Sequence, residues 1–184
     1  MQCPACGFEN IPGSDRCDEC MEPLAELDLP QPQSGVQKRL MEDPITRLET
    51  SPPHSVSSGA PVAKALELMK EMNIGCILVV DDQKLVGIFS ERDFLLKLAG
   101  LGKPLDDVLL RDVMTPKPVT LEPSDTIRYA LHLMSVGGFR HIPIVEATQV
   151  LGILSAKHVL RYLNRSVLRS EIRKALLKQP STDI

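Results

Sequence analysis

The sequence repeats itself at a fixed offset. Residues 53–93 align with residues 118–158 without a gap, and ten of the 41 aligned pairs are identical. Most other pairs keep apolar character, as Val79 and Ile144 do. A constant offset over this length is typical of a duplicated structural unit. We therefore expect two copies of one supersecondary unit.

The first copy predicts the order strand, helix, strand, strand, helix. After a short strand at residues 54–57, Pro61 suits a first helical turn, and apolar residues then recur at helical spacing. Residues 76–80 and 85–89 predict a hairpin around the turn at 81–84, and a second helix is expected over about 91–99.

The second copy follows the same order. Ser124 or Asp125 is expected to cap a helix over residues 126–136, which Gly137 and Gly138 end. Strands are expected at residues 142–145 and 150–154. A unit of about 60 residues has a marginal core alone, so the two copies are expected to pack face to face.

Composition narrows the function classes. The chain has 184 residues, is 43% hydrophobic, and has no Trp, four Phe and two Tyr, so it offers little for stacking bases of single-stranded nucleic acid. The longest aliphatic run, at about residues 77–80, is too short for a membrane span. No secretory signal is visible, which favours a cytoplasmic protein. The sequence has no P-loop and no Ser-His-Asp spacing, so no enzyme activity is expected.

Four cysteines lie close to the N-terminus in the pattern C-x2-C-x10-C-x2-C: Cys3, Cys6, Cys17 and Cys20. This spacing lets two pairs of thiolates face one ion and predicts a closed structural zinc site, with no open position for catalysis. Iron also suits four sulfurs. Two disulfides are the alternative in an oxidising compartment. Gly7 is expected to adopt a positive φ after the first pair.

These residues resemble a short zinc ribbon over residues 1–24. A ribbon of this size cannot bury a core and depends on its metal to fold. Its charged residues are mostly acidic, which argues against a phosphate backbone as partner. The resemblance implies a role in docking partners or in assembly.

The repeats resemble a tandem CBS-domain pair, the Bateman module. Three segments carry the resemblance: Gly87-Ile88-Phe89-Ser90-Glu91-Arg92-Asp93, Val113-Met114-Thr115-Pro116, and Gly138-Phe139-Arg140-His141-Ile142-Pro143-Ile144-Val145. The resemblance implies an α/β fold of the α+β type, in which two β-α-β-β-α repeats form a pseudo-symmetric pair. It also implies a homodimer and adenine-nucleotide binding in clefts between repeats.

The resemblance places the ligand site around Ser90 and Asp93. Ser90 matches the residue that contacts the ribose-phosphate region, and Asp93 matches the acceptor for the ribose hydroxyls. A capping box, in which Ser90 and Asp93 close a helix start, is the structural alternative and is compatible with binding. The exposed amides of the helix start and Arg92 favour phosphate. The family also assigns Ile88, the backbone of Val119, Phe139 and Arg140 to this site; Arg140 is equally suited to a surface or dimer interface.

The second copy departs from the pattern because His158 replaces the acid. Ser155 remains, but neutral imidazole is a poor acceptor for two hydroxyls. Lys157 and His158 could attract phosphate. We expect one good nucleotide site and one weak or empty site. His141 and Cys76 are expected to be structural.

Charge is uneven along the chain. The acidic N-terminal segment, at positions 1–60, holds ten acids and four bases, whereas positions 161–184 hold six bases and two acids. Arg161, Arg165, Arg169 and Arg173 recur at every fourth position and predict a basic helical stripe. The stripe is either a solvated face or a docking surface for an acidic partner, the acidic N-terminal segment included.

The predicted organisation is a zinc ribbon at 1–24, a linker at 25–39, repeats at 40–103 and 104–165, and a basic C-terminal helix or tail at 166–184. The leading hypothesis is a non-catalytic sensor of AMP, ADP, ATP or S-adenosylmethionine that signals to a regulated protein partner. The alternatives are an interaction scaffold without ligand and, least favoured, a nucleic-acid-binding regulator. No membrane partner is expected.

Overall fold

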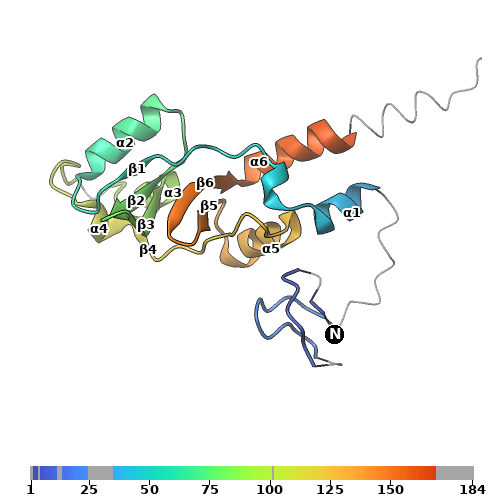
Figure 1. Ribbon diagram of the computed structural model, residues 1–184. Helices are drawn as coiled ribbons and strands as arrows, with labels where there is room; N and C mark the ends of the chain where they lie inside the picture. The colour runs from blue at the N-terminus through green and yellow to red at the C-terminus, as the bar shows by residue number, and fades with distance from the viewer. Residues whose placement is uncertain (1, 4, 12–13, 25–34, 101, 169–184) are drawn as a thin grey trace, which may run out of the picture. The chain divides into compact units, whose positions relative to one another are not determined.

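A computed structural model describes residues 2–3, 5–11, 14–24, 35–100 and 102–168 (Figure 1). The chain divides into two compact units. The first unit contains Met1–Glu49, Pro123–Arg140 and Ser155–Ile184, and the second contains Thr50–Glu122 and His141–Leu154. Most of the predicted linker and nearly all of the predicted basic tail, with Arg169 and Arg173, lie outside the described residues.

The second unit is built on two sheets. One sheet has the order β1-β2-β3-β4 and the other pairs β5 with β6. Strand β1 is parallel to β2, and β2, β3 and β4 are successively antiparallel. The elements are β1 (Ser55–Val56), α2 (Val62–Glu71), β2 (Cys76–Asp81), β3 (Lys84–Ser90), α3 (Glu91–Lys97), α4 (Leu110–Val113), β4 (Thr115–Pro116), β5 (His141–Glu146) and β6 (Gln149–Ser155).

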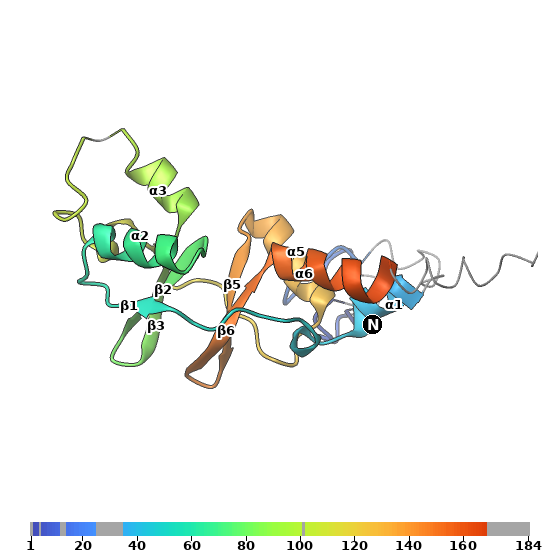
Figure 2. The ribbon, with the colours of Figure 1, turned by 90° about the horizontal axis from the view of Figure 1, so that it is seen from above.

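The β2–β3 hairpin is buried on both faces. Successive side chains along a strand point to opposite faces of the sheet, so each face packs against different residues. Ile77 and Val79 of β2 and Phe89 of β3 pack into one cluster with apolar residues of α2 and α4, and Figure 2 shows α2 running alongside this hairpin. Cys76, Leu78 and Ile88 point the other way and pack against Ile153 of β6. Residues of the two copies therefore share a core, in agreement with the face-to-face packing expected from the sequence.

The strand register confirms the duplication. Val56 of β1 lies opposite Val79 of β2 in a parallel pair. Leu121 and Ile144, which align with Val56 and Val79 in the second copy, form a parallel bridge of the same kind. The predicted strands and helices of both copies are present, and most of their bounds differ from the expected ones by one or two positions.

In each copy, the second strand of the hairpin pairs with a short segment. That segment comes just before the other copy in the sequence. Strand β4 pairs with β3 through Thr115 and Ile88, and Ser51 forms the corresponding bridge to Ile153 of β6. We call residues 50–51 and 115–116 the lead-in segments. Glycine leaves room where they pass: a Cβ on Gly87 would clash with the Met114 side chain, and one on Gly152 would lie 3.0 Å from the Ser51 carbonyl oxygen.

The described part of the first unit is mainly helical. Its elements are α1 (Gly35–Glu42), a 3-10 turn at Ile45–Arg47, α5 (Ile127–Gly137), α6 (Ala156–Tyr162) and a π-helical segment at Leu163–Leu168. The Tyr162 hydroxyl donates to the Asp43 carboxylate, and Arg165 pairs with Glu49 at 2.6 Å. Burial and the charge of Asp43 raise the pKa of Tyr162 to about 12. Arg165 of the predicted basic stripe thus pairs with an acid of the N-terminal segment.

The prediction that Ser124 or Asp125 caps α5 was wrong. Thr126 is the N-cap, and its hydroxyl accepts from the Tyr129 amide at 3.1 Å. The Asp125 carbonyl instead accepts from the Ile45 amide at 2.8 Å, so this residue joins the 3-10 turn to the helix start. Gly138 ends α5 with a φ of +66°, as predicted.

Among the described helices, none combines the length and the apolar character that a membrane span requires.

Candidate functional site

Ser90 and Asp93 meet at the junction of β3 and α3. Ser90 is the N-cap of α3, and its hydroxyl accepts from the Asp93 amide at 3.3 Å. Asp93 Oδ2 in turn accepts from the Ser90 amide at 3.0 Å and from the Ser90 hydroxyl at 2.7 Å. The capping box anticipated as the structural alternative is therefore present.

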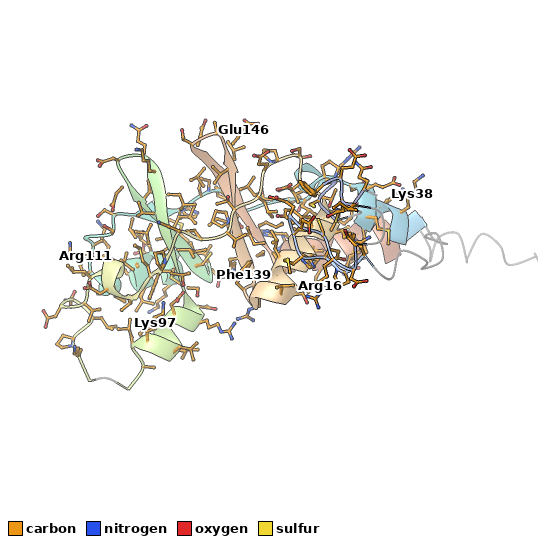
Figure 3. The ribbon with its side chains drawn as sticks, turned by 90° about the horizontal axis from the view of Figure 1, so that it is seen from below. Arg16, Lys38, Lys97, Arg111, Phe139 and Glu146 are labelled. Atoms are coloured by element: carbon orange, nitrogen blue, oxygen red, sulfur yellow. The ribbon has the colours of Figure 1, made fainter. Side chains whose placement is uncertain are left out.

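The other oxygen of Asp93 is held by two residues outside the box. Asp93 Oδ1 accepts from Lys97 Nζ at 2.7 Å and from the Thr115 hydroxyl at 3.0 Å. Lys97 lies one turn further along α3, where Figure 3 labels it, and also donates to the Val113 carbonyl at 2.7 Å. Helix α3 and strand β4 thus supply donors to one carboxylate, and the end of α4 binds the Lys97 ammonium.

These contacts keep the Asp93 carboxylate ionised. Burial works against the charge, but the donors on Lys97, Ser90 and Thr115 outweigh it and hold the pKa of Asp93 below its ordinary value. An ionised carboxylate is an acceptor only, which suits neighbouring hydroxyl groups on a sugar.

The remaining predicted ligand residues are placed as follows. Ile88 is buried in the cluster with Cys76, Leu78 and Ile153, so its side chain belongs to the core. Arg92 and Val119 are exposed. Phe139 and Arg140 belong to the first unit. Among the predicted residues, Ser90 and Asp93 are brought into direct contact.

Sequence reasoning missed Lys97 and the contact of Thr115. The spacing of Asp93 and Lys97 by four positions on one helix is a readable signal for an ion pair. No local spacing predicts the contact between Asp93 and Thr115, because it depends on the pairing of β4 with β3.

In the second copy, His158 takes the place of the carboxylate. Its Nδ1 accepts from the Ser155 amide at 3.1 Å, so the ring carries its neutral-state proton on Nε2. Burial lowers the pKa of His158, and the charges of Arg161 and Lys157 lower it further. The ring is therefore a neutral helix cap. Cys76 is buried as predicted, and burial together with the charge of Glu91 raises the pKa of its thiol to about 12.

The four N-terminal cysteines form one cluster whose sulfur atoms all lie within 4.8 Å of one another. The Cys3 and Cys20 sulfurs are 3.6 Å apart, as are those of Cys6 and Cys17. A tetrahedral site with Zn–S distances of about 2.3 Å has sulfur–sulfur edges of about 3.8 Å, whereas bonded sulfurs lie about 2.05 Å apart. The donor set fits a zinc ion better than disulfides.

Backbone amides and one buried side chain donate hydrogen bonds to the cysteine sulfurs and favour the thiolate form, which binds metal ions. The Ala5 amide donates to Cys3 Sγ at 3.4 Å, and Asn10 Nδ2 donates to Cys17 Sγ at 3.5 Å. Burial opposes ionisation of Cys17, but backbone donors and Asn10 lower its pKa to about 6. Gly7 has a φ of +78°, as predicted, and Met21 takes the corresponding position after the second cysteine pair with a φ of +59°.

The ribbon contacts helix α5 within the first unit. Glu22 accepts from Arg128 Nη2 at 2.9 Å and lies 2.5 Å from His132 Nδ1. His132 Nε2 lies 2.9 Å from the Cys20 carbonyl oxygen, and the Thr126 hydroxyl donates to the Ala5 carbonyl at 3.3 Å. These contacts, which the sequence did not suggest, join segments that lie far apart along the chain.

The repeated strand-helix units and their shared core define a protein built from two paired α/β repeats. The chain belongs to the CBS domain family: the family's sequence model matches residues 45–100 and 110–165. Both repeats are covered, so the resemblance stated from the sequence is confirmed.

Similar proteins occur in distant organisms. An uncharacterized 33.4 kDa protein in a ribosomal RNA operon of Thermofilum pendens is 31% identical over 140 residues, which cover 76% of this chain and 45% of that protein. The mitochondrial CBS domain-containing protein CBSX3 of Arabidopsis thaliana is 32% identical over 105 residues, 54% of this chain and 51% of that protein. The first curated relatives are matched over less than two thirds of their own length.

Solved structures show the same fold. A conserved protein from Pyrococcus horikoshii is 26% identical with a TM-score of 0.63, covering 68% of this chain and 95% of that chain. A crystal structure of CBSX2 in complex with AMP is 27% identical with a TM-score of 0.59, covering 68% of this chain and 99% of that chain.

Proposed function

We propose that this chain is a non-catalytic regulatory module that binds an adenosine-containing ligand at Asp93. The candidate ligands are AMP, ADP, ATP and S-adenosylmethionine. The single observation that carries the proposal is the ionised Asp93 carboxylate, which Ser90 fixes at the end of β3.

The chemistry of this carboxylate supports a ribose as the group recognised. Two vicinal hydroxyls are both donors, and an acceptor-only carboxylate can bind them together. The similar structure that contains AMP supports an adenine nucleotide as the ligand. Ile88, Arg92, Val119, Phe139 and Arg140 remain predicted contacts.

The cysteine ribbon is proposed to hold one structural zinc ion. Its four thiolates close the coordination shell, so the metal stabilises the fold of the ribbon and supplies no open position. We further propose that two chains form a homodimer through their CBS pairs. The ribbon or the C-terminal segment then transmits the ligand state to a protein partner. Such signalling requires a ligand that binds two arrangements of the chain with different affinity.

An interaction scaffold without ligand is the second candidate function. The observation that favours it is the capping box, since Ser90 and Asp93 already satisfy each other within the chain. In that case the ribbon and the repeats hold partners together, and Asp93 only stabilises the start of α3.

Isothermal titration calorimetry of the zinc-loaded full chain separates these functions. AMP, ADP, ATP and S-adenosylmethionine are titrated separately into the wild type and into Asp93→Asn. The amide oxygen of Asn can still accept from the Ser90 amide, so the cap survives while the ionised acceptor is lost. A sensor binds at least one ligand, and the variant weakens that binding at least tenfold.

Asp106→Ala is the matched control, because Asp106 is an exposed acid in the loop that follows α3. It should bind as the wild type does. If none of the four ligands binds the wild type, the sensor function is wrong and the scaffold is favoured. Equal binding by the wild type and Asp93→Asn would exclude Asp93 as the ribose contact.

A further inference from the structure

The Asp93 carboxylate is fully occupied by donors from its own chain. Each carboxylate oxygen can accept two hydrogen bonds in its plane. Oδ2 accepts from the Ser90 amide and hydroxyl, and Oδ1 accepts from Lys97 and Thr115. A ribose that binds here through its hydroxyls must therefore displace one of these four donors.

The donors on Oδ2 are the harder pair to displace. The Ser90 amide and hydroxyl form the capping box at the first turn of α3. Removing them would break the half of the capping box in which Asp93 accepts from Ser90, and would take this acceptor from the Ser90 amide. The ribose is therefore expected to compete for Oδ1.

Lys97 is the donor that can leave Oδ1. Its side chain is 40% exposed, whereas that of Asp93 is 12% exposed. An ammonium group on a flexible stem regains water when it moves away, so releasing it costs little. The Val113 carbonyl, which accepts from Lys97 at 2.7 Å, favours the position of the ammonium beside the carboxylate when no ligand competes for Oδ1.

We propose that Lys97, with Thr115, acts as an intramolecular competitor for the ribose hydroxyls and sets the threshold concentration at which adenosine ligands bind. This inference rests on the proposed function. It identifies Lys97 as an affinity-determining residue whose presence weakens ligand binding, because binding first requires the ion pair between Lys97 and Asp93 to open.

The inference has a direct consequence for affinity. The ion pair is open to solvent at its Lys97 end, where water screens the charge, so its removal should tighten ribose binding by about two- to fivefold. The gain must depend on the ribose hydroxyls, because Asp93 is the group that is released. A ligand without these hydroxyls should gain nothing.

The test measures adenosine and 2′,3′-dideoxyadenosine binding by calorimetry to the zinc-loaded full chain and to Lys97→Met. Adenosine carries no phosphate, so the lost positive charge does not confuse the comparison. We expect Lys97→Met to bind adenosine about two- to fivefold more tightly and dideoxyadenosine no more tightly than the wild type. Thr115→Val removes the other donor to Oδ1 and should also tighten adenosine binding.

Lys70→Met is the matched control, because Lys70 is an exposed lysine in the last turn of α2. It should leave both affinities unchanged. Circular dichroism melting verifies that each variant is folded.

The outcomes distinguish this inference from the proposed function. If the wild type binds adenosine and Lys97→Met binds it equally or more weakly, the competitor role is wrong while the sensor function stands. A gain for dideoxyadenosine as large as that for adenosine also overturns it. If the wild type binds neither adenosine nor AMP, the proposed function fails and the inference fails with it.

Discussion

The Ser155 amide donates to Nδ1 of His158 in the position where the Ser90 amide donates to the Asp93 carboxylate. The duplicated helix start has thus kept its backbone bond while the acceptor changed from an ionised acid to a neutral ring. The change makes one cap sensitive to acid in a pH range where the other is not.

The stability of the protein should fall as the pH drops below about 6.5. His158 has a lowered pKa in the folded chain, where burial and the charges of Arg161 and Lys157 oppose protonation and Glu49 favours it. The unfolded chain therefore takes up the proton first, and the stabilisation present above the unfolded pKa is lost as the pH falls. Urea unfolding midpoints at pH 7.5 and 5.5 measure the loss.

His158→Gln removes the titrating ring and retains an acceptor for the Ser155 amide, so the difference between the two midpoints should shrink. His54→Gln controls for the loss of a histidine outside this cap and should keep the wild-type difference. An unchanged difference in His158→Gln would show that another group produces the acid sensitivity.

Gly87→Ala should destabilise the protein by about 1–3 kcal/mol. The new methyl group would clash with the Met114 side chain and lie 3.1 Å from the Thr115 carbonyl oxygen, so the Met114 side chain must move and the lead-in segment must give by a few tenths of an ångström. Gly59→Ala is the matched control, because a Cβ there meets nothing within 4 Å. Guanidinium unfolding of both variants measures the difference, and equal stabilities would show that the lead-in segment yields freely.

Each chain should contain one zinc ion held by the N-terminal cysteines. Cys17→Ser removes a ligand from the most buried part of the cluster and should reduce the bound zinc to a small fraction of its wild-type content. Cys76→Ala is the control, because Cys76 is buried in the β2 core and is not one of the four clustered cysteines, so this variant should keep the full zinc content. Elemental analysis measures zinc and iron together, and iron in place of zinc would contradict the assignment.

Glu22→Gln should loosen the ribbon from α5 without removing its metal. The change removes the charge that Arg128 and His132 face. The contact between the ribbon and α5 should lose about 1 kcal/mol of stabilising free energy, as expected for such a partly exposed pair. Hydrogen exchange should become faster in ribbon amides and in the exposed turns of α5, with zinc content unchanged. Glu19→Gln, at an exposed acid of the ribbon, should exchange as the wild type does.

The sequence predicted the elements that depend on periodicity. The fixed offset indicated the hairpins and long helices of both copies, because apolar alternation and helical spacing are local properties. It did not predict β4, since Thr115 and Pro116 become a strand only when they pair with β3. Thr126 was missed as the cap because Ser124 and Asp125 are equally good capping residues by type.

The same limit applies to the candidate site. Ser90 and Asp93 are close in sequence and form a recognisable pattern, so their contact could be predicted. The four-residue spacing of Asp93 and Lys97 also could have been used. The hydrogen bond from Thr115 to Asp93 depends on a tertiary contact, and the contact of Glu22 with α5 joins residues 106 positions apart. Such contacts leave no local signal in a single sequence.

Each lead-in segment pairs with the hairpin of the other repeat, and this exchange decides which fragments of the chain have a covered sheet. The edge of β3 is covered by residues encoded after it, and β6 is met by residues encoded before it. A fragment that stops at residue 109 would lack α4 and β4 and would leave the β3 edge bare, and a bare edge recruits strands from other molecules. Each repeat therefore depends on the other to cover the outer edge of its hairpin.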